Sequence, residues 1–184
     1  MIEYPWEAAY PAHVLESQQF TPNDLNRLAS QAKTMEKIWR RGGCQDFSDG
    51  RVRVVFYQPS TRTFTSSLAA AHYLGIKVVY ASDTAGEFSS AVKGESLEDT
   101  INIHCGYDHD PNSSILVLRH PQGNASRRAA EIIRQGCGNR PMHIVNAGCG
   151  KQDGQHPTQA ILDVVTIKER FGGKLRKIGR ASCR

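Results

Sequence analysis

The 184-residue sequence has no hydrophobic run near the roughly 20 residues needed to cross a membrane. It also has no internal repeat and no low-complexity segment. The first seven residues carry two acidic side chains and lack the basic start and apolar centre of a secretory signal. We therefore expect a soluble, cytoplasmic, globular protein rather than a membrane, fibrous or secreted one.

Paired cysteines and a basic stripe are also missing. The five cysteines are an odd number without a C-x-x-C pair, and this pattern favours free thiols in a reducing compartment. The net charge of +5 comes from 23 basic and 18 acidic residues, and part of the excess lies after residue 173. No aromatic side chains alternate with these basic residues, so we expect small anions rather than nucleic acid as partners.

The hydrophobic pattern alternates between strands and helices. Strands are expected at 51–57, 76–80, 114–118 and 142–145, and helices at 22–40, 64–74, 95–104, 124–135 and from 157 onward. Such alternation implies right-handed β-α-β units. The predicted fold class is therefore α/β: a Rossmann-like parallel sheet of about four strands, with helices on both faces.

Polar stretches follow the predicted strands, at 58–63, 82–93, 119–121 and 146–159. The carboxyl ends of parallel strands meet at one edge of a sheet, and ligands gather there. The side chains brought together in this way are basic or carry hydroxyls: Arg62, Lys93, Arg119, His156, Ser60, Thr61, Thr63 and Ser89. They predict an anion-binding site.

The turn from Ser60 to Thr63 is the centre of this prediction. It joins an apolar strand to a helix, so backbone N–H groups and the positive end of the helix dipole point at one spot. The Arg62 guanidinium adds a fork that can bind two phosphate oxygens. The alternative is an ordinary helix start, with Ser60 or Thr61 as the N-cap and Arg62 in solvent.

Five motifs, in this order, resemble those of a known family. They are Ser60–Thr63, Ser89 with 93–100, 119–121, 146–148 and 156–160. Together they closely resemble the carbamoyl-phosphate domain of the aspartate and ornithine carbamoyltransferases, over residues 14 to 175. Thr158 and the stretch from Ser89 to Thr100 are more similar to the aspartate enzymes, and an ornithine or other carbamoyltransferase is the alternative.

The resemblance implies a role for each motif. The turn from Ser60 to Thr63 would bind the phosphate, and Arg119 would reach both the phosphate and the carbonyl oxygen. His156, together with Thr63, would donate to that carbonyl oxygen as negative charge develops on it. Gln159 would hold the carbamoyl amino group. The residues implied in catalysis are Arg62, Thr63, Arg119 and His156.

The resemblance also implies partners. Ser89 and Lys93 would complete the site of a neighbouring subunit, so a homotrimer is expected, with a regulatory or pathway enzyme as a further partner. The implied reaction transfers the carbamoyl group of carbamoyl phosphate to the amino group of L-aspartate, in pyrimidine biosynthesis. It needs no cofactor and no metal, because positioning and electrostatics suffice.

Residues 1–18 have little periodicity and are expected to form an irregular lead-in. The resemblance divides the rest into a carbamoyl-phosphate domain (19–156), a long helix (157–173) and an aberrant basic tail (174–184). The tail does not resemble the start of the second domain, which binds the amino acid in the family. We therefore expect that domain to be missing, with weak binding and little turnover by this chain alone. Three positions depart from the family pattern, namely Gln58, Phe64 and Cys149.

Other interpretations remain for single features. Gly148-Cys149-Gly150 follows a strand, as in nucleotide-binding domains, but the next glycine is Gly154, so G-x-G-x-x-G is not met. The stretch 104–110 has metal-ligand residue types without zinc or EF-hand spacing. His156 could instead cap a helix or be a buried, hydrogen-bonded histidine. The whole chain could also be a non-catalytic domain that binds a phosphate ligand or a partner.

Overall fold

The computed structural model describes residues 13–85, 90–107, 114–136, 142–150 and 154–171. Its parallel sheet has the order β2-β1-β3-β4. The strands are β1 (Arg51–Phe56), β2 (Lys77–Ser82), β3 (Ser114–His120) and β4 (Met142–Cys149). The helices are α1 (Pro22–Arg40), α2 (Thr61–Leu74), α4 (Leu97–Gly106), α5 (Ala125–Gly136) and α6 (Pro157–Arg170), with 3-10 turns η1 (Ser17–Gln19) and η2 (Ser90–Lys93).

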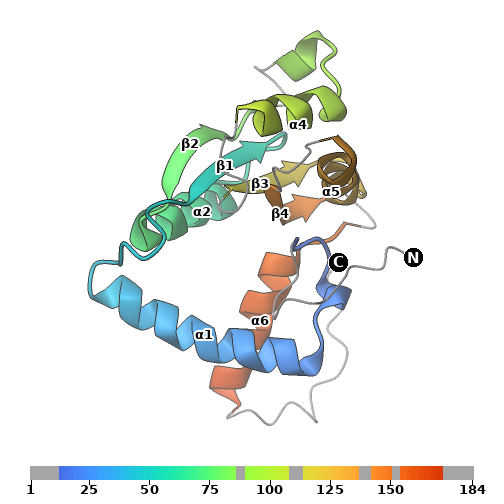
Figure 1. The fold of residues 1–184 in the computed structure, drawn as a ribbon. Helices are drawn as coiled ribbons and strands as arrows, with labels where there is room; N and C mark the ends of the chain where they lie inside the picture. Colours follow the sequence, from blue (N-terminus) through green and yellow to red (C-terminus); the bar gives the residue numbers. More distant parts are fainter. Residues whose placement is uncertain (1–12, 86–89, 108–113, 137–141, 151–153, 172–184) are drawn as a thin grey trace.

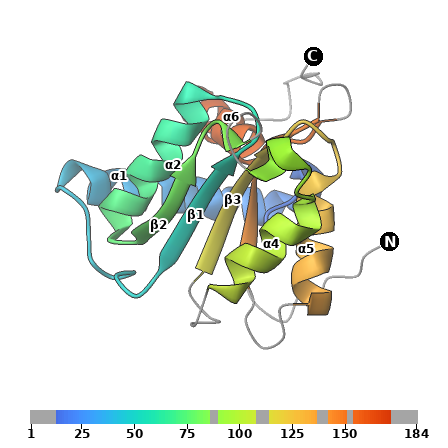
Figure 2. The same cartoon turned by 90° about the horizontal axis from the view of Figure 1, so that it is seen from above.

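Helices cover both faces of the sheet, as the sequence predicts. Alternate residues of a strand point to opposite faces, so Leu116 and Leu118 pack with Ile101 of α4 and Ile133 of α5. Val117 packs on the other face with Ala71 of α2. The helix α1 packs against α6, which it crosses below the sheet in Figure 1, and Figure 2 shows the sheet between its helices from above.

Several predicted boundaries at the strand ends are wrong, and β2 and β3 end at Ser82 and His120 instead of residues 80 and 118. The second helix begins at Thr61 instead of residue 64, because Ser60 takes the N-cap position and Thr61 to Thr63 form the first turn. The last strand continues past Val145 to Cys149. A polar Asn146 is tolerated inside this strand because its side-chain amide donates to the carbonyl of Leu15, 2.8 Å away.

The described part of the lead-in pairs with the sheet, although the sequence predicted it to be irregular. Val14 forms a parallel bridge to Val145. Its N–H donates to the carbonyl of Ile144 at 2.7 Å, and its carbonyl accepts from the N–H of Asn146 at 2.8 Å. The segment therefore satisfies backbone groups along the open side of β4.

The expectation of free thiols throughout is wrong for Cys105, which is disulfide-bonded. Cys44 and Cys149 are free. Among the described residues, no helix combines the length and apolar composition that crossing a bilayer requires.

The packing of β3 predicts a large stability loss on truncation. Leu116 is 0% exposed, so Leu116→Ala removes buried methyl groups and leaves a cavity. We expect the free energy of unfolding to fall by about 2–5 kcal/mol in urea titrations. Met35→Ala, at a helix position that is 41% exposed, should cost much less, and equal losses for the two variants would contradict this core assignment.

Candidate anion-binding site

A cavity of about 830 Å³ runs along one face of the sheet between α2 and α6. Its floor is apolar and includes Val52, Val117 and Val145 from β1, β3 and β4. At the carboxyl ends of the strands its lining becomes polar. The polar lining residues there are Ser60, Arg62, Thr63, Arg119, His156, Thr158 and Gln159.

The start of α2 leaves its backbone donors open. Ser60 occupies the N-cap position, but its side chain makes no capping bond and instead donates to Thr63 Oγ1 at 3.2 Å. The first turn of this helix contains no acidic residue. The first N–H groups of a helix have no intrahelical acceptor. This geometry favours an anion at the helix start over the ordinary capped helix.

Arg119 contributes a buried donor that has no partner. Its Nη1 donates to the carbonyl of Ala147 at 3.1 Å, which fixes the guanidinium at the end of β3. Its Nε is buried and, within the described part of the chain, lacks a hydrogen-bond acceptor. A buried polar group without a partner is costly and needs an explanation. An anionic ligand oxygen would supply the missing acceptor.

His156 lies beside this guanidinium at the start of α6. Its Nδ1 is 3.1 Å from the hydroxyl of Thr158, and its side chain does not cap the helix. Burial lowers the pKa of His156, the nearby Arg119 charge lowers it further, and Asp163 opposes the shift. The imidazole is therefore neutral near pH 7 and has one N–H to donate.

A glycine makes this close arrangement of Arg119 and His156 achievable. Gly148 has φ 112°, and a Cβ added there would lie 2.4 Å from Arg119 Nη1 and 3.1 Å from His156 Cδ2. Its N–H donates to Asn146 Oδ1 at 2.9 Å, so the buried asparagine fixes the turn. Both basic side chains thus pack against a position that has no room for a methyl group.

The structure brings together six of the predicted site residues: Ser60, Arg62, Thr63, Arg119, His156 and Gln159. Gln159 is exposed, and its amide donates to Asp163 Oδ1 at 2.9 Å. Thr61 and Lys93 are exposed and do not line the cavity. Ser89 lies outside the described residues.

The sequence prediction missed the parts played by Thr158 and Gly148. Thr158 contacts the His156 ring. A hydroxyl two residues after a histidine is a local signal that could have indicated this contact. The requirement for Gly148 depends on Arg119 from another strand, and only the assembled sheet reveals it.

The described residues give no support to the alternative metal site at 104–110. Within the described ranges, no group of three or more His, Cys, Asp or Glu side chains gathers in a way that could hold a metal ion. His104 packs against Tyr80, with ring centroids 5.2 Å apart, and residues 108–110 lie outside the described part. The glycine stretch at 148–150 leads to a helix only at Pro157.

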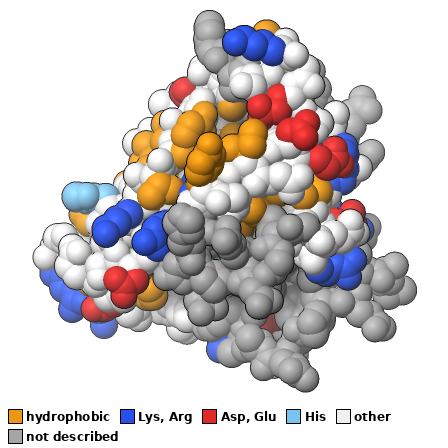
Figure 3. All heavy atoms as spheres, turned by 45° about the horizontal axis from the view of Figure 1, so that its top comes forward, with side chains coloured by type: hydrophobic (Ala, Val, Ile, Leu, Met, Phe, Trp, Pro, Cys, Tyr) orange, Lys and Arg blue, Asp and Glu red, His pale blue; other side chains and the backbone are white. Residues whose placement is uncertain are grey.

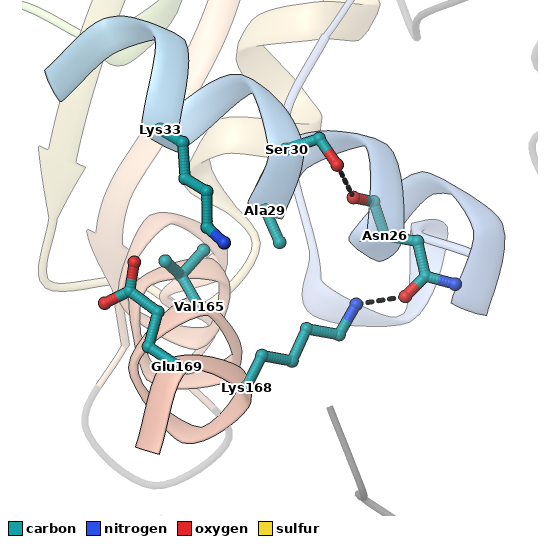
Figure 4. Close-up of a pocket in the computed structure, with 7 residues that line it drawn as sticks. All are labelled: Asn26, Ala29, Ser30, Lys33, Val165, Lys168 and Glu169. Atoms are coloured by element: carbon teal, nitrogen blue, oxygen red, sulfur yellow. Dashed lines mark hydrogen bonds between the residues drawn. The ribbon is translucent and has the colours of Figure 1, made fainter. Parts of the chain in front are cut away.

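A second cavity, of about 400 Å³, lies between α1 and α6, away from the strand ends (Figure 4). Lys168 donates to Asn26 Oδ1 across it, and Ser30 Oγ donates to the Asn26 carbonyl at 3.1 Å. These polar groups therefore bind one another, and we assign no ligand to this cavity.

Comparison with known proteins gives the site a context. The family model for the aspartate/ornithine carbamoyltransferase carbamoyl-P binding domain matches residues 12–169. Aspartate carbamoyltransferase 2, chloroplastic, of Pisum sativum is 44% identical over 160 residues, which are 86% of this chain and 38% of that protein. The aspartate carbamoyltransferase catalytic subunit of Thermoplasma acidophilum is 42% identical over 151 residues, covering 82% of this chain and 44% of its own.

Solved structures of aspartate transcarbamoylases have a fold similar to that of this chain. Aspartate transcarbamoylase from Trypanosoma cruzi in complex with carbamoyl phosphate has a TM-score of 0.71 and 33% identity, covering 87% of this chain and 45% of that one. The catalytic subunit of M. jannaschii aspartate transcarbamoylase has a TM-score of 0.69 and 33% identity, covering 88% and 48%. The chain therefore spans less than half the length of these relatives.

The close packing at Gly148 predicts that a single methyl group disrupts the anion site. In Gly148→Ala the added carbon would displace the Arg119 guanidinium, so we expect inorganic phosphate to lose its stabilising effect in thermal unfolding. Gly42→Ala is the matched control, because Gly42 has φ 92° but nothing within 4 Å of an added Cβ. Both variants carry backbone strain, so equal phosphate effects would contradict the role of Gly148.

Proposed function

Since the chain belongs to the family of carbamoyl-phosphate-binding domains of the aspartate and ornithine carbamoyltransferases, we propose that it binds carbamoyl phosphate at the polar end of the α2–α6 cavity. The observation that carries this proposal is the Nε of Arg119, which is buried and has no partner among the described residues, in a cavity that the start of α2 also lines. Phosphate oxygens would accept from Arg62, Thr63 and the helix N–H groups.

We assign the chemistry to positioning and electrostatics. The α-amino group of the second substrate attacks the carbamoyl carbon, a C–N bond forms, and the bond from that carbon to the phosphate oxygen breaks. Phosphate leaves and takes up the proton that the amino nitrogen loses. Negative charge builds on the carbonyl oxygen before phosphate departs. Arg119, His156 and Thr63 would donate to that oxygen. A neutral His156 keeps one ring N–H with which to donate such a hydrogen bond.

L-aspartate is the second substrate in this proposal. The relatives in Pisum sativum and Thermoplasma acidophilum are named as aspartate carbamoyltransferases. Structures of the Trypanosoma cruzi protein are described as complexes with carbamoyl aspartate and with PALA. Since this chain spans less than half of these proteins, complete turnover is proposed only for a form in which the remaining half is supplied.

A homotrimer is part of the proposal. The edge strand β2 exposes Val78, Val79 and Tyr80, which are 40% to 46% accessible. Figure 3 shows hydrophobic side chains gathered on one face of the molecule. Open edges and apolar patches of this kind favour association. A second copy on this edge would let the exposed Lys93, at the end of η2, complete a neighbouring site.

The cytoplasmic location stays a prediction, because the plant relatives are named as chloroplastic.

Removal of one guanidinium tests ligand binding. Carbamoyl phosphate should raise the midpoint of thermal unfolding of the unaltered chain, by mass action on the folded state. In Arg62→Ala this rise should disappear, because the phosphate loses its bidentate partner. Arg134→Ala, an exposed arginine of α5, should leave the rise unchanged.

An equal thermal shift in Arg62→Ala would rule out the proposed site. Formation of N-carbamoyl-L-aspartate is then assayed after adding the second domain of a relative. A thermal shift without product would identify a non-catalytic anion-binding domain instead.

Mixing two variants tests whether subunits share a site. Lys93→Ala chains and Arg62→Ala chains should each bind carbamoyl phosphate weakly. In mixed trimers, an intact Arg62 from one chain meets an intact Lys93 from another, so part of the binding should return in calorimetric titration. Binding in the mixture that merely equals the average of the two variants would exclude a shared site.

A further inference from the structure

Beneath the start of α4, a series of hydrogen bonds joins two parts of the chain that are distant in sequence. The Tyr57 hydroxyl donates to Thr100 Oγ1 at 3.0 Å, and Thr100 Oγ1 donates to Glu95 Oε1 at 2.6 Å. None of the three side chains lines the α2–α6 cavity, so the proposed chemistry does not use them directly.

Tyr57 fixes one end of this series to the anion site. It lies between the last residue of β1 and the turn that begins α2. Its N–H donates to the carbonyl of Arg119 at 2.9 Å. Its ring meets the His120 ring edge-on, with centroids 4.5 Å apart. The hydroxyl of Tyr57 therefore has a defined position relative to the end of β3.

Glu95 fixes the other end to η2. Its N–H donates to the carbonyl of Ser90 at 3.1 Å and closes the turn that contains Lys93. Gly94, with φ 97°, turns the chain between Lys93 and Glu95. A capping box between Ser96 and Asp99 then sets the start of α4. Lys93 is therefore positioned by Glu95, whose backbone N–H and side-chain carboxylate both form hydrogen bonds.

We propose that Tyr57, Thr100 and Glu95 are positioning residues that hold η2, and with it Lys93, in register with the anion-binding strand ends. This inference rests on the proposed role of Lys93 in a neighbouring site. Through Tyr57, the position of Lys93 is coupled to the same strand ends that place Arg119.

The three groups suit this role because each hydrogen bond between them has a fixed donor and a fixed acceptor. The hydroxyl of Thr100 has a single proton, which goes to the Glu95 carboxylate at 2.6 Å rather than to the Ser96 carbonyl at 3.2 Å, and its lone pair accepts from Tyr57. Bonds to a carboxylate are stronger than neutral ones. Burial raises the pKa of Tyr57, so its hydroxyl keeps the donated proton throughout the neutral range.

A pair of variants at Thr100 tests the proposal. Thr100→Val keeps the shape and removes the hydroxyl, whereas Thr100→Ser keeps the hydroxyl. We expect Thr100→Val to weaken carbamoyl phosphate binding about 3- to 10-fold, because the bonds to Tyr57 and to Glu95 are both lost, and Thr100→Ser to restore it. Equal binding by the two variants would overturn the proposal.

A double variant shows whether the effect passes through Lys93. Lys93→Ala removes the side chain that Thr100 is proposed to position. In the Lys93→Ala background, Thr100→Val should therefore cause no further loss of carbamoyl phosphate binding. Multiplied losses would overturn the proposal, since Thr100 would then act independently of Lys93. Arg62→Ala is measured alongside. Loss of binding in that variant would support the anion site even if the Thr100 variants contradict the positioning role.

Hydrogen exchange gives a readout that needs no ligand. In Thr100→Val the amides of residues 90–95 should exchange faster than in the unaltered chain, and in Thr100→Ser they should not. Amides of β3 serve as the control for global stability. Unchanged exchange in residues 90–95 would overturn the positioning role, whatever ligand the cavity binds.

Discussion

The arrangement of the site depends on the contact between the Arg119 guanidinium and the bare α-carbon of Gly148. Arg119 lies next to the last residue of β3 and Gly148 lies in β4, so their proximity is fixed by the register of two neighbouring strands. His156 packs against the same glycine from the start of α6. One small residue thereby sets the spacing of two basic groups that act on one oxyanion in the proposed reaction.

This arrangement keeps a half-buried arginine charge next to a neutral histidine, and the fold has to compensate for it. The Ala147 carbonyl holds one guanidinium nitrogen, while Nε stays without a partner among the described residues. Burial and Arg119 both disfavour protonation of His156. In the proposed function an anion would accept from these donors, and its binding would stabilise the folded state.

The sequence was sufficient for the fold class, the parallel sheet and the convergence of Ser60, Arg62, Arg119 and His156, because strand periodicity and strand-end geometry are local rules. It missed the extension of β4 through Asn146, whose side chain is satisfied by Leu15, 131 positions away. It also missed the helical first turn of α2, since threonines have low helix propensity. Contacts that span long stretches of chain leave no local pattern.

The exposed edge of β2 has a consequence for how such a chain behaves in a cell. Within the described part of the chain no strand pairs with the outer edge of β2 beside Val78 and Val79, and such an edge is a template to which an extended segment can add. In the proposed trimer the correct occupant arrives only by encounter with another copy, at a rate set by abundance. Newly made chains at low abundance would wait longest with this edge uncovered, so expression level itself becomes a determinant of whether the protein assembles or aggregates.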